Sequence, residues 1–349
     1  MSSDVSTPSA TDRVASPPAW LAPLLGVQSL AEGDAFDVGG QSFAVRGGIP
    51  RSQRLVSDAQ AQTREAFGYK WSRRDTFESE ASRAHLRGWL VERYGEVASA
   101  PWLFEQSPHP LFIDAGCGAG RPALELLGPV LSSLRYLGVD IADAVDVARL
   151  RFAERGLPGG FLQADIADLP LPAGSVDMIF SEGALHHTNS TEQTLRSLAR
   201  VLAPGGRFLF YVYRRKGPVR EFTDDHIRAQ MRQMSPQQAW SALEPLTRLG
   251  IELGRLDAEV DIPEPIGLLD IPAGRTTVQR LFYWHVAKAF YRPDFSFDEM
   301  NHVNFDWYAP ASAHRQTPED VRRWCAEADM VIEREVVEDA GITVIARKA

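Results

Sequence analysis

Strand-like and helix-like segments alternate between residues 110 and 214, and this alternation constrains the fold more than any other feature. Helical patterns such as RPALELLGPVL and AVDVARLRFAERG separate short apolar runs. Such alternation is typical of a parallel sheet covered by helices on both faces. We therefore expect an α/β fold with a doubly wound sheet. Its strands are predicted in LFIDAG, RYLGVD, FLQADI, VDMIFSEG and RFLFYVY.

The last helix of this region carries clear signals. Ser190 is expected to cap its start, with Gln193 as the reciprocal capping-box partner. Its predicted buried stripe is formed by Leu195, Leu198, Ala199 and Leu202.

The alternation stops after the fifth strand and resumes near the end of the chain. In TPEDVRRWCAEADM, Thr317 is the expected N-cap and Pro318 suits the first helical turn. The segments VIEREVVE and ITVIARK then predict a closing antiparallel hairpin. We therefore assign residues 110–213 and 317–349 to one core. Residues 214–316 form an insertion, which is expected to act as a substrate-binding lid.

Residues 19–109 are expected to form an N-terminal extension that covers the ligand site. Two alternating runs joined at Gly39 and Gly40 predict a hairpin, and a helical pattern runs from about Asp75 to Glu96. Residues 1–18 are rich in Ser, Thr and Pro, which predicts a disordered tail, and they lack the features of a secretory signal.

Composition excludes several classes of protein. The net charge of -9 and the pI near 5.5 argue against nucleic acid as a partner. The two cysteines, Cys117 and Cys325, are too few for a disulfide framework or a zinc cluster, so we expect no metal and a reducing, cytoplasmic compartment. No apolar run is long enough to predict a membrane helix.

The segment LFIDAGCGAGRPALELL places three glycines between a strand and a helix. The spacing of Gly116, Gly118 and Gly120 is G-x-G-x-G, and a tight turn without a ligand would explain it equally well. Strand-end acids favour a nucleotide site. Asp140 suits ribose hydroxyls, and Asp165 with Ile166 suits adenine.

Asp114, just before the turn, suits an ammonium group or a role in orienting the loop. An NAD-dependent dehydrogenase is the alternative for this site. The glycine spacing, the late position of the turn in the chain and the terminal hairpin all disfavour it.

Four segments together resemble the class I S-adenosylmethionine-dependent methyltransferases, with a core like that of the type 11 and UbiE group. They are FIDAGCGAG, GVDIA, QADIADLPLPAGSVDMIFSEGALHHT and SLARVLAPGGRFLF. The resemblance implies S-adenosyl-L-methionine as cofactor and S-adenosyl-L-homocysteine as product. The cofactor-binding residues that it implies are Tyr69, Trp71, Asp114, Gly116, Cys117, Gly118, Gly120, Asp140, Ile141, Asp165, Ile166, Ser181 and Glu182.

The segment FAVRGGIPR is similar to the end of the small Trm112-like module found ahead of some bacterial methyltransferases. The zinc-ligand cysteines of that module are missing here, so metal binding is not inferred.

Catalytic groups are expected in SEGALHHT, after the fourth strand. Glu182, His186 and His187 are the candidates for a proton acceptor, although a histidine here could simply pack beneath the next helix. The segment lacks the Asn/Asp-Pro-Pro-Tyr/Phe motif of amino methyltransferases, which argues against a DNA adenine or cytosine-N4 enzyme.

The insertion is expected to select the substrate. Its best candidates are Trp307, Tyr308, His314 and Arg315, where the chain returns to the core. A charge run that includes Arg214, Lys216 and Arg220 suits an anionic substrate, although a solvated loop explains it more simply.

The favoured function is methylation of a small organic molecule, at oxygen or carbon, with no nucleic acid or membrane as partner. The alternatives are methylation of RNA or another macromolecule, and a cofactor-binding partner subunit without catalytic activity.

Overall fold

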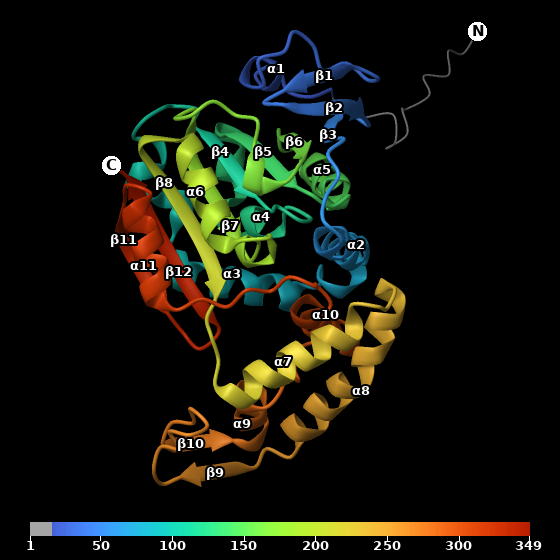
Figure 1. Cartoon of the computed structure of the whole chain (residues 1–349), viewed down its shortest axis with the longest axis vertical. Helices are drawn as coiled ribbons and strands as arrows, with labels where there is room; N and C mark the ends of the chain where they lie inside the picture. Colours follow the sequence, from blue (N-terminus) through green and yellow to red (C-terminus); the bar gives the residue numbers. More distant parts are fainter. Residues whose placement is uncertain (1–15) are drawn as a thin grey trace, which may run out of the picture.

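A computed structural model of the protein describes residues 16–349 (Figure 1). Most of the predicted N-terminal tail, residues 1–15, lies outside the described residues. The strands form one ten-stranded sheet of order β1-β2-β3-β6-β5-β4-β7-β8-β12-β11 and a separate two-stranded sheet in the insertion.

The predicted parallel core is confirmed. Strands β4 to β8 run parallel, the closing strand β12 is antiparallel to β8, and β11 is antiparallel to β12. Their bounds are β4 Leu111–Ala115, β5 Arg135–Asp140, β6 Gly160–Gln163, β7 Val176–Glu182, β8 Leu202–Tyr213, β11 Met330–Val337 and β12 Gly341–Lys348.

The N-terminal hairpin extends this sheet, which the sequence did not predict. β1 (Ala35–Val38) and β2 (Gln41–Arg46) are joined at Gly39 and Gly40 as expected, and β3 (Ile49–Ser52) continues to the edge of β6. Arg51 pairs with Gln163 in the parallel β3–β6 register, and its Nη1 donates to Gln163 Oε1 at 2.8 Å. The exposed edge of β6 is thereby covered. The likeness to a Trm112-like module stays a prediction.

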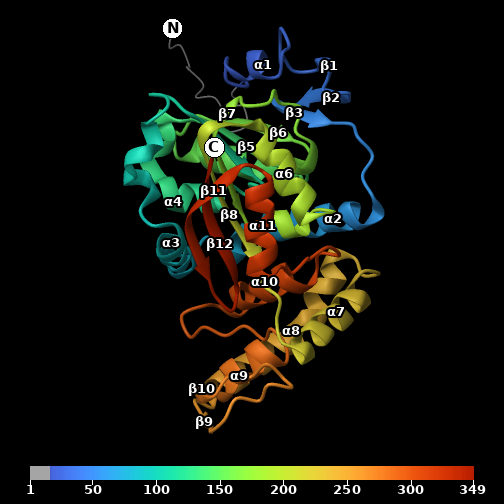
Figure 2. The ribbon, with the colours of Figure 1, turned by 60° about the vertical axis from the view of Figure 1, so that its left-hand side comes forward.

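Helices cover both faces of the sheet (Figure 2). The helices α6 (Thr191–Val201) and α11 (Pro318–Glu327) pack on one face, and α3 (Glu80–Tyr94), α4 (Arg121–Leu127) and α5 (Ala144–Glu154) pack on the other. All four residues of the stripe predicted for α6 are buried, although the last of them begins β8.

The capping signals are partly confirmed. Thr317 Oγ1 accepts from the backbone N–H of Asp320 at 3.2 Å and caps α11. Ser190 Oγ accepts from the N–H of Gln193 at 3.3 Å, but among the described contacts Gln193 returns no side-chain bond. The predicted capping box is therefore half formed.

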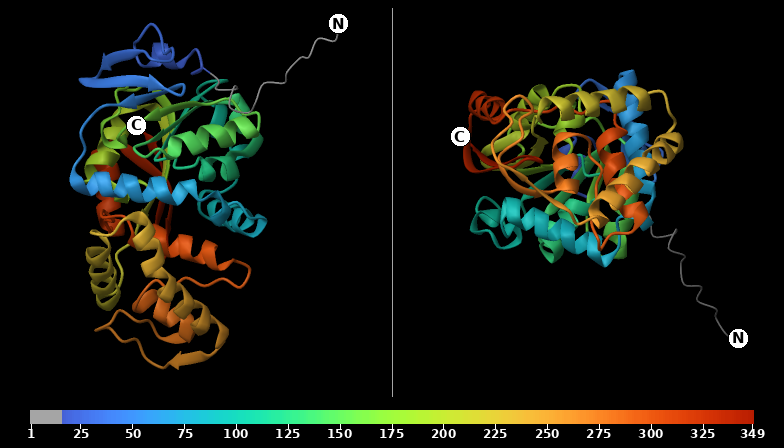
Figure 3. Two further views of the ribbon diagram at one scale, coloured as in Figure 1. Left: turned by 90° about the vertical axis from the view of Figure 1, so that its right-hand side faces the viewer. Right: turned by 90° about the horizontal axis from the view of Figure 1, so that it is seen from below.

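A helix that the sequence did not predict, α2 (Asp58–Ser72), crosses the carboxyl ends of the strands. In Figure 3 it lies between the sheet and the insertion. The insertion consists of α7 Pro218–Met231, α8 Pro236–Arg255, β9 Glu259–Ile262, β10 Gly274–Thr277, α9 Val278–His285 and α10 Phe297–Tyr308.

Short helical turns complete the fold. They are α1 Leu21–Leu24, η2 Arg74–Thr76, η3 Val97–Ser99, η4 Pro101–Phe104, η5 Gly128–Ser133, η6 Ile166–Asp168 and η7 Leu185–His187.

Candidate functional site

A cavity of about 360 Å³ lies at the carboxyl ends of the parallel strands. The strand ends and the glycine turn form one wall, α2 and α3 form the sides, and α9 and α10 of the insertion form the opposite wall. This is the position where doubly wound folds bind ligands. The core and the insertion therefore line one cavity together.

The glycine turn brings bare backbone to the cavity. Gly116 has φ +81°, and a Cβ atom on it would lie 2.1 Å from the Cβ of Ala184. Gly118 has φ +51°, and a Cβ atom there would lie 2.6 Å from the indole nitrogen of Trp71. Both positions therefore require glycine. Trp71 from α2 covers the turn and lines the cavity, as predicted for a residue that covers the ligand.

Two of the three predicted acids line the cavity. Asp140 Oδ2 accepts from the N–H of Gly118 at 2.8 Å, so this carboxylate also fixes the glycine turn. Asp165 Oδ2 accepts from Gln60 Nε2 at 2.8 Å, and its Oδ1 caps η6 through the N–H of Ala167 at 2.9 Å. Ile141 and Ile166 line the cavity beside these acids.

Besides Tyr69, which is described below, five residues predicted to bind cofactor do not line the cavity: Asp114, Cys117, Gly118, Gly120 and Ser181. The side chain of Asp114 is buried and accepts from the Tyr136 hydroxyl at 2.8 Å; burial raises its pKa to about 7. Ser181 is buried and donates to the carbonyl of Ala115 at 2.8 Å. The side chain of Cys117 is buried, and Gly120 caps α4 with φ +68°. The buried side chains of Asp114, Cys117 and Ser181 therefore lie behind the turn.

Glu182 ends β7 and faces the cavity. Its Oε2 accepts from the Tyr94 hydroxyl at 2.5 Å. Burial raises the pKa of Glu182 to about 8, and the Tyr94 bond limits that rise. The Glu182 carboxylate is therefore a stronger base than an ordinary one.

The two predicted histidines are placed differently. His187 lines the cavity, and its Nδ1 lies 2.6 Å from the carbonyl oxygen of Ser312, so the neutral ring donates there. Burial lowers the pKa of His187 to about 4. His186 does not line the cavity; its ring stacks on Tyr213 with centroids 3.6 Å apart. The packing role considered for one histidine therefore describes His186.

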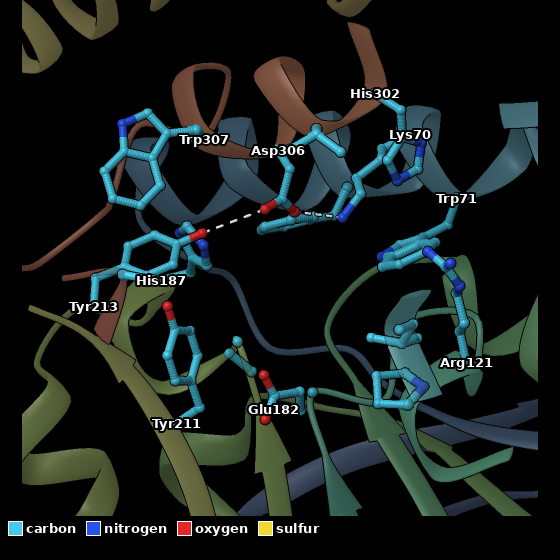
Figure 4. Close-up of a pocket in the computed structure, with 18 of the residues that line it drawn as sticks. Lys70, Trp71, Arg121, Glu182, His187, Tyr211, Tyr213, His302, Asp306 and Trp307 are labelled. Atoms are coloured by element: carbon cyan, nitrogen blue, oxygen red, sulfur yellow. Dashed lines mark hydrogen bonds and ion pairs between the residues drawn. The ribbon is translucent and has the colours of Figure 1, made fainter. Parts of the chain in front are cut away.

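An acid–base cluster that the sequence did not predict lies opposite Glu182. Figure 4 shows Asp306 projecting from α10 between Tyr213 and Lys70. Asp306 forms an ion pair with Lys70 from α2 and lies 3.3 Å from the Tyr213 hydroxyl, which donates to it. Burial alone would raise the pKa of Asp306, but Lys70 and Lys288 outweigh it and hold the pKa well below its usual range. The carboxylate therefore stays charged.

Of the residues predicted where the insertion returns to the core, Trp307 lines the cavity, and so do Lys216 and Arg220 of the charge run. Tyr308 is buried behind it, where its hydroxyl accepts from the backbone N–H of Lys288 at 2.6 Å. His314 Nε2 lies 3.0 Å from the carbonyl oxygen of Thr188, in the loop beneath the cavity.

The two predicted arginines pair with acids outside the cavity. Arg315 forms ion pairs with Glu221 and Asp225 at 2.8 Å, and Arg214 lies 3.5 Å from Asp339. These carboxylates hold both guanidinium groups away from the cavity.

Tyr69, predicted to cover the cofactor, also points elsewhere. Its ring packs against Trp240 and Phe305 in the core between α2, α8 and α10. Side chains two residues apart in a helix point to nearly opposite sides, so Tyr69 and Trp71 cannot share one face of α2. Of the two, Trp71 alone lines the cavity, and its role as a cofactor cover stays a prediction.

Lowered histidine pKa values predict sensitivity to acid. Burial holds the pKa of His186 well below the 6.5 of an exposed histidine, so below about pH 6.5 the unfolded chain takes up a proton that the native chain does not. Stability should therefore fall as the pH drops. Replacing His186 by Phe keeps a stacked ring but removes the group that takes up the proton. The slope of unfolding free energy against pH should therefore decrease by about 1 kcal/mol per pH unit.

Urea unfolding at pH 5 and pH 6 measures this slope. His226→Phe, on the exposed side of α7, is the matched control and should leave the slope unchanged. An identical slope in His186→Phe and the parent would contradict the prediction.

Within residues 16–349, no helix is both long and apolar enough to cross a membrane. The same residues contain no cluster of three or more His, Cys, Asp or Glu side chains arranged to hold a metal ion.

A family model and several known proteins match the central part of the chain. The family model described as "Methyltransferase domain" matches residues 113–210. "Probable tRNA methyltransferase 9B" of Bos taurus is 32% identical over 144 residues, which are 38% of this chain and 29% of that protein. "Ubiquinone/menaquinone biosynthesis C-methyltransferase UbiE" of Azotobacter vinelandii is 38% identical over 100 residues, or 28% of this chain and 40% of that protein.

Among solved structures, the 1,6-didemethyltoxoflavin-N1-methyltransferase of Burkholderia thailandensis aligns with a TM-score of 0.44 and 15% identity over 91% of this chain and 100% of that chain. The chain spans well under half the length of the two curated relatives named above. The domain match confirms the predicted resemblance for the core, and with it S-adenosylmethionine as the expected cofactor.

Proposed function

We propose that this chain, whose residues 113–210 carry a methyltransferase domain, is an S-adenosylmethionine-dependent methyltransferase acting on a small organic molecule. The observation that carries the proposal is one cavity shared by the glycine turn, two strand-end acids and the insertion.

The cofactor end of the cavity fits an adenosyl group. Asp140 and Asp165 offer carboxylate oxygens to ribose hydroxyls and to the adenine amino group, while Ile141 and Ile166 offer apolar contacts to the ring. The bare backbone at Gly116 leaves room for close approach of a ligand.

The charged end of the cofactor also has partners. Arg121, in the first turn of α4, lines the same end of the cavity and suits the methionine carboxylate. Trp71 lies against the turn at Gly118. The bound cofactor would supply an electrophilic methyl group, and the protein has to align the acceptor and exclude water.

Glu182 suggests which kind of acceptor atom is methylated. A carboxyl with a pKa of about 8 can take a proton from a hydroxyl or an acidic C–H near neutral pH, which supports methylation at oxygen or carbon. Tyr94 holds this carboxyl in place through its hydroxyl. His187 is uncharged at neutral pH, so it suits an accepting role and not a cationic one.

The shape and charge of the site favour a small acceptor over RNA. The insertion contributes aromatic and charged side chains to an opposing wall of the cavity, which suits a compact ligand. The tRNA methyltransferase name belongs to a relative that shares only 38% of this chain, and the net charge of -9 gives little attraction for a phosphate backbone. Methylation of RNA remains the second candidate, and we propose that the insertion acts as a lid over the acceptor.

Calorimetry with S-adenosylhomocysteine tests the cofactor site. Asp140→Ala removes two ribose acceptors and the bond that holds Gly118, so affinity should fall by about 10- to 100-fold. Asp143→Ala, three residues further along, is the matched control because that carboxylate is exposed. Unchanged affinity in Asp140→Ala would refute the ribose assignment.

A further inference from the structure

Three cations gather at the end of the cavity that the insertion forms. Lys216 follows β8, Arg220 lies in the first turn of α7, and Lys288 follows α9. All three line the cavity. A solvated loop therefore does not explain the positions of Lys216 and Arg220. Arg215, which belongs to the same charge run, is exposed.

The described residues supply only part of the negative charge that these cations need. Arg220 Nε pairs with Asp224 Oδ1 at 2.8 Å, and this guanidinium also donates to the carbonyl of Tyr283. Lys216 Nζ donates to backbone carbonyls, including those of Arg214 at 2.9 Å and Ala340 at 3.0 Å, which carry no net charge. Of these two cations, Arg220 alone has a carboxylate within hydrogen-bond distance among the described residues.

Lys288 is the least satisfied of the three. The side chain is more than nine-tenths buried, yet within residues 16–349 its ammonium group has no hydrogen-bond partner. It lies 4.7 Å from the centroid of the Trp307 ring. The nearest acid that acts on it, Asp306, is already engaged by Lys70.

An enclosed group of cations without matching anions is costly, because burial weakens their hydration and they repel one another. The pKa values reflect this cost. Burial lowers the pKa of Lys216 to about 7 and that of Lys288 to about 8, and Arg220 adds to the effect in both cases. An anion placed between them would remove the imbalance.

Aromatic rings surround the same cations. Trp284, Phe290 and Trp307 line this end of the cavity, and the Lys216 ammonium lies 5.9 Å from the ring centroid of Trp284 and 5.6 Å from that of Trp307. Such walls suit a flat apolar body, while the cations suit oxygen atoms that carry negative charge.

We infer that the methyl acceptor is an apolar, flat organic acid whose oxyanion, a carboxylate or a phosphate, binds Lys288 and is supported by Lys216 and Arg220. This inference rests on the proposed function and deepens it. The anion would anchor the acceptor at the insertion end of the cavity. Its other end would then point toward Glu182 and the glycine turn, which line the opposite end.

Calorimetry with three matched probes tests the inference without methyl transfer. The probes are 1-naphthoate, 1-naphthyl phosphate and the neutral 1-naphthamide, each titrated with and without S-adenosylhomocysteine. The anions should bind at least about 10-fold more tightly than the amide, since only they gain a bond to a charged group. Of the two anions, the one that binds more tightly indicates whether the acceptor carries a carboxylate or a phosphate.

Lys288→Gln should weaken binding of the anions by about 10- to 100-fold and leave the amide within about twofold. Unchanged amide binding also shows that the variant is folded. Arg248→Gln is the matched control, because Arg248 is an exposed cation of the same insertion, paired with Glu244 outside the cavity.

The inference is overturned if the parent protein binds the amide as tightly as the anions, binds none of the probes, or is unaffected by Lys288→Gln. Loss of S-adenosylhomocysteine binding with intact anion preference would instead count against the proposed cofactor, so the two failures are distinguishable.

Discussion

Replacing Glu182 by Gln is expected to reduce kcat by about 10²- to 10⁴-fold, the usual contribution of a general base. Glutamine keeps the shape of the side chain and can still accept from the Tyr94 hydroxyl, but it cannot take a proton. Affinity for S-adenosylhomocysteine should change little. A variant with unaltered turnover would eliminate Glu182 as the proton acceptor.

The pH dependence distinguishes this role from a structural one. Only the deprotonated Glu182 can act as a base, so kcat/KM should rise with pH and level off above about pH 8. The Tyr94 hydroxyl lowers the pKa of Glu182, so Tyr94→Phe should move the rise to higher pH while leaving the plateau largely intact. A profile that does not shift in Tyr94→Phe would assign the rise to another group.

The core strands were predictable because each is short, apolar and bounded by a turn signal. Strands β4, β5 and β7 lie where the patterns placed them, and Asp140 and Asp165 line one cavity as their strand-end positions implied. The third strand ends at Gln163, two residues before Asp165, because that carboxylate turns to cap η6. Local sequence patterns were therefore sufficient to place these strands and the two acids.

Helix α2 escaped prediction because its buried face is polar. Gln60, Thr63 and Lys70 are buried at helical spacing, but they line the cavity instead of an apolar core. Hydrophobic periodicity detects only helices that bury apolar side chains. The available signal was Ser57, which caps the helix by accepting from the N–H of Gln60 at 3.3 Å.

The cluster around Asp306 was unpredictable for a different reason. Lys70 and Asp306 lie far apart in sequence, and only the docking of α10 against α2 brings them together. The capping box of Ser296 and Glu299 could have located α10, but not its partner. Trp307 and Tyr308 were both predicted because they adjoin the return to the core, but Tyr308 does not line the cavity and its hydroxyl accepts from the N–H of Lys288.

Breaking the ion pair of Lys70 and Asp306 is expected to cause a large loss of unfolding free energy. Their side chains are 5% and 28% exposed, so each charge depends on its partner more than on water. Removing one partner from a buried pair usually costs 3–5 kcal/mol of unfolding free energy. Because Asp306 keeps some contact with the cavity, we expect Lys70→Met to cost about 3 kcal/mol, the lower end of that range.

Urea unfolding measures this cost. Arg248→Met, which breaks an exposed pair with Glu244, is the matched control and should cost below about 1 kcal/mol. Asp306→Leu should be at least as damaging as Lys70→Met, since Lys288 also loses its nearest acid. The double variant should recover part of the loss, because two apolar side chains leave neither charge of the pair buried alone. If Lys70→Met costs no more than Arg248→Met, the pair is solvated in the native protein and does not stabilise the contact between α2 and α10.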